Sequence, residues 1–362
     1  MSSAYAQAAA DAPLAAAAGT PRLRVENLST SFMTERGRVQ SVADVSFTVP
    51  VGRTLALVGE SGSGKSVSNL SLMNLHARSA QPRVGGSARF LRRNGETVEL
   101  IGLAEPVFRT LRGNEIAMVF QEPMTSLNPL LAVGEQIAES VRLHQGLGRA
   151  AALAQAQRML ELVEIPAAAR RLREYPHQLS GGMRQRVMIA IAMACSPTLL
   201  IADEPTTALD VTIQAQILAL IGRLQKETGM SVLFVTHNLG VVAQYADEIA
   251  VMYAGRIVER GDVRRLFDRP AHPYTRALLN CLPAMARRRG AVRADGRPRL
   301  AAIEGQVSSP FDMPPGCAFR PRCPLAVPAC DLAVPPMVRI DGRQEARCIR
   351  IGEIERIGEI EP

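Results

Sequence analysis

The sequence predicts an α/β protein with a parallel sheet at its centre, an antiparallel β lobe, a helical insertion and a small cysteine-containing C-terminal extension. Three patterns lead to this fold class. Apolar and polar residues alternate over residues 23–49, which is typical of strands with one buried face. An apolar period typical of helices runs through residues 130–178. Short apolar runs, each followed by a polar or glycine-rich turn, occupy residues 54–58, 199–202 and 232–235.

The order of the elements along the chain favours a parallel sheet. The first apolar run leads through a glycine-rich turn into a helix expected over residues 65–75, which makes the first βα unit. The two later runs end in charged or polar residues, at the edge where open α/β sheets bind ligands. A hairpin is expected over residues 249–258 with its turn at Ala254 and Gly255. The globular core is expected to finish near Phe267.

Length, composition and charge narrow the functional classes. A chain of 362 residues is expected to form about two domains. No window approaches the roughly 18 uninterrupted apolar residues of a membrane-spanning helix. Residues 1–20 lack the Lys or Arg of a secretory signal and carry Asp11, which favours a flexible leader. The net charge of +8 permits binding to nucleic acid or anionic lipid, but aromatic residues make up only 4% and Trp is absent, which argues against base stacking.

A glycine-rich motif follows the first apolar run. Residues 59–66 have the sequence GESGSGKS and match the pattern G-x-x-x-x-G-K-[ST] in the strand, loop and helix context that the pattern needs. Glycines let backbone N–H groups turn toward phosphate oxygens, and the helix N-terminus adds partial positive charge. Lys65 is expected to bridge the outer phosphates and Ser66 to offer its hydroxyl to Mg²⁺. The residues expected to bind nucleotide here are Gly59, Ser61, Gly62, Ser63, Gly64, Lys65, Ser66 and Val67.

Two further motifs carry chemistry. Asp203 and Glu204 end an apolar run; Asp203 is expected to hold the water shell of Mg²⁺, and Glu204 to orient and deprotonate the attacking water. Upstream of them, residues 179–183 (LSGGM) open a long helical run. The paired glycines after Ser180 expose N–H groups at a helix start, which is a second phosphate-binding device. One nucleotide uses both devices only when they face each other, which favours two chains arranged head to tail.

Together these motifs resemble the ATP-binding subunits of ABC transporters, over roughly residues 23–282. The resemblance implies an ABC-type P-loop ATPase domain with a RecA-like parallel sheet core. It also implies that Gln121 is the Q-loop glutamine that touches Mg²⁺ and the lytic water, that Asp210 belongs to the D-loop, and that His237 is the switch histidine on the γ-phosphate. Phe32 is expected to stack on adenine.

The LSGGM segment resembles the signature motif of that family, which contacts the ATP held by the other subunit. Met183 stands where the family more often has Gln, so the resemblance implies backbone contacts from Ser180 and Gly182. The residues expected to meet ATP in trans are Ser180, Gly181, Gly182, Met183 and Asp210. The catalytic residues implied by the resemblance are Glu204, His237 and Gln121.

The part of the chain after the motor resembles a narrower group. Residues 269–278 (RPAHPYTRAL) resemble the segment that marks ATPases of oligopeptide, dipeptide and nickel importers, and residues 125–129 (TSLNP) and 316–324 (GCAFRPRCP) are similar to the same group. We therefore expect an importer ATPase that energises uptake of oligopeptides or dipeptides. The alternatives are an importer ATPase for nickel or another solute, and a soluble ABC ATPase acting on DNA or ribosomes. The soluble class is expected to carry coiled-coil insertions or tandem motors, which this sequence lacks.

Four of the cysteines crowd into the C-terminal part of the sequence: Cys317, Cys323, Cys330 and Cys348. With no export signal, thiols are expected to stay reduced, so the crowding favours metal ligation over disulfides. The irregular spacing, without a tight C-x-x-C pair, favours a [4Fe-4S] cluster. A zinc site and unligated, packed cysteines are the alternatives.

The predicted organisation is a flexible leader (1–20), an ABC ATPase domain (21–268) with a helical insertion at about 122–195, a peptide-importer extension (269–349) and a low-complexity tail (350–362). ATP, Mg²⁺ and the cluster are the expected cofactors. The resemblance implies a second ABC ATPase subunit, a paralogue, two membrane permease subunits and an extracytoplasmic solute-binding protein as partners, with no nucleic acid. The chain is expected to be peripheral, at the cytoplasmic face of the inner membrane.

Overall fold

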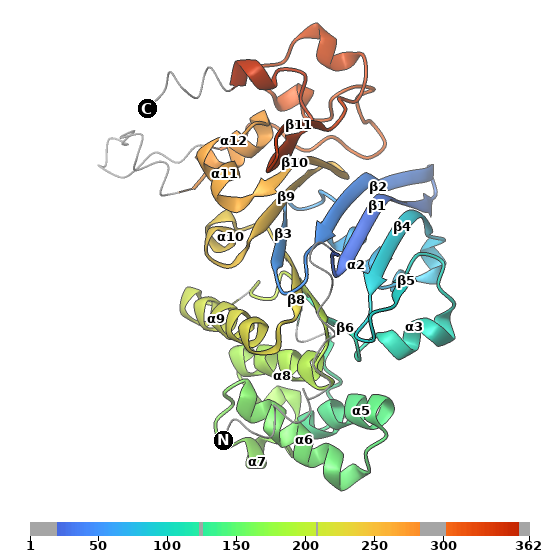
Figure 1. Ribbon diagram of the computed structural model, residues 1–362, viewed down its shortest axis with the longest axis vertical. Helices are drawn as coiled ribbons and strands as arrows, with labels where there is room; N and C mark the ends of the chain where they lie inside the picture. Colours follow the sequence, from blue (N-terminus) through green and yellow to red (C-terminus); the bar gives the residue numbers. More distant parts are fainter. Residues whose placement is uncertain (1–19, 123–125, 208, 283–301, 355–362) are drawn as a thin grey trace, which may run out of the picture. The chain divides into compact units, whose positions relative to one another are not determined.

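The computed structural model describes residues 20–122, 126–207, 209–282 and 302–354 (Figure 1). Its contacts group these residues into two compact units. The first unit is drawn from residues up to 24, 48–54 and 88–234, and the second from residues 25–47, 55–87 and 235 onward. The leader expected before residue 20, the basic linker expected at about residues 284–298 and most of the expected tail lie outside the described residues.

Buried strands form the centre of the first unit. They are β6 (Ile116–Val119), β7 (Leu199–Asp203) and β8 (Ser231–Thr236), in the order β8-β7-β6. β6 and β7 run parallel, with Ile116 opposite Leu199. Every residue of β7 and β8 is buried, as a parallel sheet covered on both faces requires. The two apolar runs predicted as buried strands are therefore confirmed. A separate antiparallel pair consists of β4 (Arg83–Leu91) and β5 (Thr97–Glu99).

Helices occupy the stretch where the sequence predicted an insertion. α5 (Val133–Gln145) buries Val133, Ile137 and Val141 on one face, which confirms the apolar period predicted for this stretch. It packs against α6 (Arg149–Leu162) and α8 (Gly181–Met193), and Figure 1 shows these three helices lying together. The other helical elements of the first unit are α3 (Glu105–Leu111), α7 (Ala168–Arg171), the 3-10 helix η2 (Pro176–Gln178) and α9 (Val211–Thr228).

The second unit is built on strands in the order β11-β12-β10-β9-β3, accompanied by the neighbouring pair β2-β1. β3 and β9 are parallel, with Val58 opposite Val251, whereas the remaining pairs of the five are antiparallel. The strands are β1 (Leu23–Thr34), β2 (Gly37–Val49), β3 (Thr54–Val58), β9 (Glu248–Tyr253), β10 (Arg256–Asp262), β11 (Val338–Asp341) and β12 (Gln344–Ala346).

The hairpin between β9 and β10 turns at Ala254 and Gly255, as predicted. Both residues have positive φ, 47° and 81°, which is the geometry of a two-residue turn whose twist matches the flanking strands. The predicted helix after the glycine-rich turn is also present, although it ends at Leu72. The helical elements of the second unit are α2 (Lys65–Leu72), η1 (Arg78–Ala80), α10 (Leu239–Tyr245), α11 (Val263–Asp268), α12 (Pro273–Asn280), η3 (Arg320–Arg322) and η4 (Pro328–Asp331).

The C-terminal extension shares the core of the second unit. β12 extends the sheet by pairing with β10, where Glu259 lies opposite Ala346. Tyr274 of α12 and Phe319 are packed into the same apolar cluster as Val58 and Val251. The buried core of this unit therefore includes residues of the C-terminal extension beyond residue 267. Among the described residues, none of the helices combines the length and the apolar character needed to span a membrane.

Candidate functional site

The loop of residues 59–66 joins β3 to α2 in the second unit, and two of its glycines are required by its path. A Cβ placed on Gly59 would lie 2.2 Å from the carbonyl oxygen of Met252, so a larger residue would force the backbone apart. Gly64 has φ 100°, in the region that favours glycine, directly before Lys65 begins α2. The glycines therefore let the loop lie close against β9 and turn sharply into the helix.

Lys65 is buried, with only 4% of its surface exposed. Its ammonium group donates hydrogen bonds to backbone carbonyls of the loop. Its Nζ donates to the carbonyl oxygens of Gly59 at 2.8 Å and of Glu60 at 3.0 Å. Burying an ammonium without such partners would be costly. The loop thus closes around its own lysine, at the N-terminal end of α2, where the helix dipole adds positive potential.

The carboxyl end of β7 carries the two acidic residues in the first unit. Asp203 is buried as the last residue of the strand, and Glu204 follows it with φ 46°, a strained conformation for a residue with a side chain. Glu204 Oε2 accepts hydrogen bonds from the Thr207 hydroxyl at 2.9 Å and from Gln121 Nε2 at 3.4 Å. The structure therefore brings Gln121 and Glu204 together, although they are 83 positions apart.

Two more of the predicted residues start helices of the first unit. Ser180 is the N-cap of α8, with its Oγ accepting from the Met183 N–H at 3.3 Å. Asp210 is the N-cap of α9, with its Oδ1 accepting from the Ile213 N–H at 2.9 Å. Such caps satisfy N–H groups that have no partner inside the helix.

His237 and Phe32 belong to the second unit, like the glycine-rich loop. His237 is exposed directly after β8, and its neighbour Asn238 caps α10 by accepting from the Gly240 N–H at 3.0 Å. The ring of Phe32 lies 5.0 Å from the ring of His76 in an edge-on arrangement. Burial lowers the pKa of His76, so the ring beside Phe32 stays neutral at pH 7.

Sequence reasoning missed several residues that contact the predicted ones. The Thr207 hydroxyl donates a hydrogen bond to the Glu204 carboxylate. The sequence feature that could have indicated this contact is a hydroxyl residue three positions after the carboxylate. Tyr274 and Arg322 both hold Glu60 of the loop. Both lie in the segments 269–278 and 316–324 that resemble importer ATPases, but their contact with Glu60 had no sequence signal, because they lie more than 200 positions further along the chain and reach the loop only through the fold.

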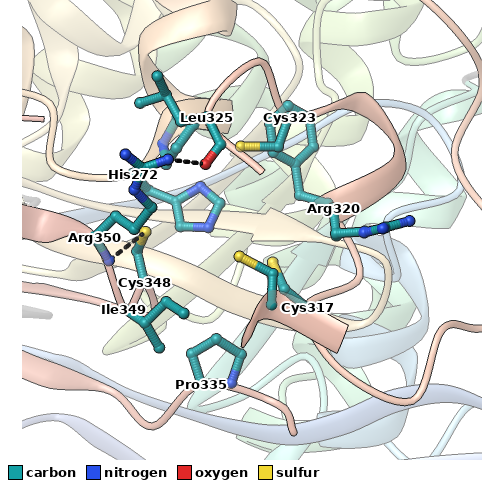
Figure 2. Close-up of a pocket in the computed structure, with 12 residues that line it drawn as sticks. His272, Cys317, Arg320, Cys323, Leu325, Pro335, Cys348, Ile349 and Arg350 are labelled. Atoms are coloured by element: carbon teal, nitrogen blue, oxygen red, sulfur yellow. Dashed lines mark hydrogen bonds between the residues drawn. The ribbon is translucent and has the colours of Figure 1, made fainter. Parts of the chain in front are cut away.

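The four C-terminal cysteines line one small cavity in the second unit (Figure 2). Figure 2 shows the sulfur atoms of Cys317, Cys323 and Cys348 directed toward the space between them. The segments of Cys317 and Cys330 are joined by a backbone hydrogen bond of 2.8 Å from the Cys317 N–H to the Cys330 carbonyl. A Cβ on Gly316 would lie 2.1 Å from that same carbonyl oxygen, so glycine is required for this approach.

Burial raises the pKa of the thiols of Cys317 and Cys323, and it raises that of Cys348 to about 11. Repulsion between neighbouring thiolates adds to the effect, so these groups stay protonated at pH 7. Arg320 and Arg350 are also among the residues that line the cavity. Among the residues the structure describes, no three His, Cys, Asp or Glu side chains are close enough together to hold a single metal ion.

The fold and the glycine-rich loop define a P-loop nucleotide-binding protein. Residues 42–207 match the family described as ABC transporter, and residues 258–330 match the family described as oligopeptide/dipeptide transporter, C-terminal region. A dimeric ATP-binding cassette, solved in a post-hydrolysis state bound to ADP and Pi, superposes with a TM-score of 0.59 at 26% identity. That superposition covers 67% of this chain and 99% of the cassette.

Curated relatives match almost the whole chain. A putative peptide import ATP-binding protein of Brucella abortus (strain 2308) is 52% identical over 339 residues, which covers 92% of this chain and 98% of the relative. A second protein of the same description and strain is 49% identical over 328 residues, covering 91% and 94%. The chain belongs to the ATP-binding proteins of ABC transporters, in the group that carries the oligopeptide/dipeptide C-terminal region.

Proposed function

We propose that this chain is the ATP-binding and hydrolysing subunit of an ABC importer that energises the uptake of oligopeptides or dipeptides across the cytoplasmic membrane. The observation that carries the ATPase part is the closed loop in which Lys65 is buried against its own backbone carbonyls. The peptide part is supported by the C-terminal match and by the relatives described as peptide import proteins.

Nucleotide binding is assigned to the loop and to α2. The N–H groups of residues 59–67 cradle the phosphates, and Lys65 exchanges its carbonyl partners for phosphate oxygens. The Ser66 hydroxyl and Asp203 are the residues that would hold Mg²⁺, whose charge stabilises the transferring phosphoryl group. Phe32 is the residue proposed to stack on adenine.

Hydrolysis is assigned to the carboxyl end of β7. Glu204, oriented by Thr207 and Gln121, takes the proton of the attacking water. His237 is proposed to stabilise charge on the γ-phosphate. Asp203 is proposed to hold the water shell of Mg²⁺, so the two adjacent carboxylates have separate roles.

A second ATPase subunit completes each site in this proposal. The N-terminal end of α8, with Ser180, Gly181, Gly182 and Met183, would contact the ATP held by the partner subunit, together with Asp210 at the start of α9. The partner is a paralogous ATPase, and two membrane permease subunits and an extracytoplasmic solute-binding protein complete the transporter. The chain is proposed to bind peripherally to the cytoplasmic face of the membrane, and no nucleic acid takes part.

Uptake in cells tests the cargo. A deletion strain that requires an amino acid is supplied with it only as a dipeptide or a longer peptide, and is complemented with the wild type or with Glu204→Gln. Growth on either peptide with the wild type alone supports the proposal. Growth of both strains on peptides, with a difference only in nickel accumulated by the cells, would instead assign the chain to nickel uptake.

We further infer that Cys317, Cys323, Cys330 and Cys348 hold a [4Fe-4S] cluster. A cluster binds each thiolate through a different iron, which fits four thiols placed around one cavity, whereas zinc draws four donors to about 2.3 Å from a single point. The positive charge of Arg350, which acts on the Cys323 thiol, would offset part of the negative charge of four thiolates. When bound, such a cluster would crosslink the segments of the extension and would require the raised-pKa thiols to lose their protons.

Anaerobic purification tests the cluster. Iron and sulfide in matching amounts, with an absorption band near 400 nm that disappears in Cys317→Ser, are the expected result. Stoichiometric zinc in the same preparation would assign the cavity to zinc, and a metal-free protein with normal stability would leave the cysteines as packing residues. None of these results bears on the ATPase assignment, which rests on other residues.

A further inference from the structure

Glu60, the second residue of the phosphate loop, is held at both its backbone and its side chain by the C-terminal part of the chain. The Glu60 N–H donates to the Tyr274 hydroxyl at 3.0 Å. Its carboxylate accepts from Arg322 Nη1, at 3.0 Å to Oε2 and 3.3 Å to Oε1. All three residues belong to the second unit.

Arg322 is itself fixed by several partners. Its side chain is only 5% exposed, against 28% for Glu60. Its Nε donates to the carbonyl oxygen of Glu304 at 2.9 Å, and its guanidinium lies 5.8 Å from the centre of the Tyr253 ring. An arginine held this way presents its charge to Glu60 in one orientation, which makes the pair stronger than an exposed ion pair of mobile side chains.

Tyr274 is equally constrained. Its ring is fully buried and lies 4.6 Å from the Tyr253 ring and 5.3 Å from the Phe319 ring. Phe319 in turn lies 5.2 Å from Tyr253. The hydroxyl that accepts a hydrogen bond from the Glu60 N–H is therefore placed by an aromatic cluster to which α12, β9 and the cysteine-containing segment each contribute one ring.

The position of Glu60 bears directly on Lys65, because the Glu60 carbonyl oxygen is one of the two carbonyls that accept from Lys65 Nζ. A shift of the Glu60 peptide would move this carbonyl and would change the placement of the lysine. It would also move the N–H groups that follow Glu60 in the loop.

We propose that Arg322 and Tyr274 are positioning residues for nucleotide binding, through which the C-terminal extension holds the phosphate loop in its phosphate-accepting shape. The inference rests on the proposed ATPase function and adds to it a contact by which the C-terminal extension holds the phosphate loop. Because the two residues touch the loop and not the reacting atoms, they affect how tightly nucleotide binds more than how fast it is split.

The test measures ATP affinity and steady-state kinetics of the full-length chain carrying Arg322→Gln, Arg322→Lys or Tyr274→Phe. Arg322→Gln and Tyr274→Phe are expected to raise the Kd for MgATP and the KM about tenfold, with kcat changed less than about twofold. Arg322→Lys keeps the positive charge and is expected to recover part of the affinity, although an ammonium lacks the planar guanidinium that donates to both carboxylate oxygens. Arg339→Gln is the matched control, because Arg339 lies in the same extension but is 74% exposed and pairs with Glu345.

A double-variant cycle separates positioning from general destabilisation. If Arg322 acts through Glu60, then Glu60→Gln combined with Arg322→Gln binds ATP no more weakly than the worse single variant. Unchanged affinity in Arg322→Gln and Tyr274→Phe, or additive losses in the double variant, would overturn the inference. If Arg322→Gln fails to fold, the ATP affinities of Arg322→Lys and Tyr274→Phe test the inference in its place. A wild-type chain that binds no ATP would instead count against the proposed function itself.

Discussion

In the proposed function, Lys65 is the residue on which the affinity for nucleotide depends most directly. It is buried, and the loop carbonyls of Gly59 and Glu60 are its hydrogen-bond acceptors. Phosphate oxygens carry full negative charge and are stronger partners for an ammonium than neutral carbonyls. The lysine is therefore held in place before the nucleotide arrives, which reduces the entropy lost on binding.

Replacing Lys65 with Ala should abolish tight ATP binding. We expect the Kd for MgATP, measured by calorimetry, to rise by at least about a hundredfold, because a charge-assisted contact and a buried cation are lost together. Lys226→Ala is the matched control, since Lys226 is exposed on α9. Equal affinity in the Lys65 and Lys226 variants would remove the loop from nucleotide binding.

Replacing Glu204 with Gln should separate binding from turnover. The amide keeps the size of the side chain but cannot take a proton, so kcat should fall by roughly a hundredfold or more while MgATP still binds. A phosphate-release assay measures turnover, and an equilibrium binding assay measures the affinity for MgATP. Glu227→Gln, on the exposed surface of α9, is the control. Normal turnover in Glu204→Gln would show that another group activates the water.

At the scale of elements, α12 depends on an uncharged histidine at its start. His272 is the N-cap, and its Nδ1 accepts from the Tyr274 N–H at 3.1 Å, which requires a ring nitrogen without a proton. Burial lowers the pKa of His272 from 6.5 to about 3. The buried carboxyl of Glu259 accepts from the His272 N–H at 2.9 Å, and burial raises the pKa of that carboxyl. The start of this helix is thus held by two buried titratable groups.

The lowered pKa of His272 predicts that the folded state loses stability in mild acid. The folded state keeps the ring neutral while the unfolded chain takes up a proton below pH 6.5, so this stability is complete above pH 6.5 and declines as the pH falls toward 3. At pH 5 the loss is roughly 2 kcal/mol. The raised pKa of Glu259 acts in the opposite direction, because protonating that carboxyl favours the folded state.

Thermal melts at pH 7.5 and pH 5.0 measure this effect in the wild type and in His272→Asn. Asn keeps an acceptor for the helix start but does not titrate. Both proteins contain Glu259, so its contribution cancels when the two changes in Tm are compared. We expect the Tm of the wild type to fall more than that of the variant. An equal fall in both would show that His272 does not govern the acid response.

At the scale of the whole molecule, the C-terminal extension connects the cysteine cavity to the phosphate loop. Arg322 lies between Cys317 and Cys323, in the short helix η3, and both cysteines line the cavity. Its guanidinium binds Glu60 of the loop. A change at the cavity that moves η3 therefore reaches the loop through one side chain.

Replacing Cys317 with Ser should weaken ATP binding in the same direction as Arg322→Gln, although by less, since the arginine itself remains. The measurement is the Kd for MgATP on anaerobically purified protein. Cys281→Ser is the control, because Cys281 ends α12 and does not line the cavity. A Cys317 variant that loses its bound metal yet binds ATP as the wild type does would show that cavity and loop are independent.

The sequence by itself determined the features that neighbouring residues encode. The glycine-rich loop between a strand and a helix, the acidic end of β7, the position of Ser180 at a helix start and the turn at Ala254 all depend on backbone geometry within a few residues. The apolar periods likewise predicted the buried strands and the face of α5. These signals are local, so a single sequence is enough to detect them.

Only the tertiary structure decided which distant residues meet. The pairing of β12 with β10, the packing of Phe319 and Tyr274 into one core and the contact of Arg322 with Glu60 join segments far apart in the chain. No local pattern encodes such pairs, because they depend on the register of the sheet and on where an intervening chain returns. The sequence therefore determined the glycine-rich loop between β3 and α2, whereas the fold alone placed the C-terminal extension upon it.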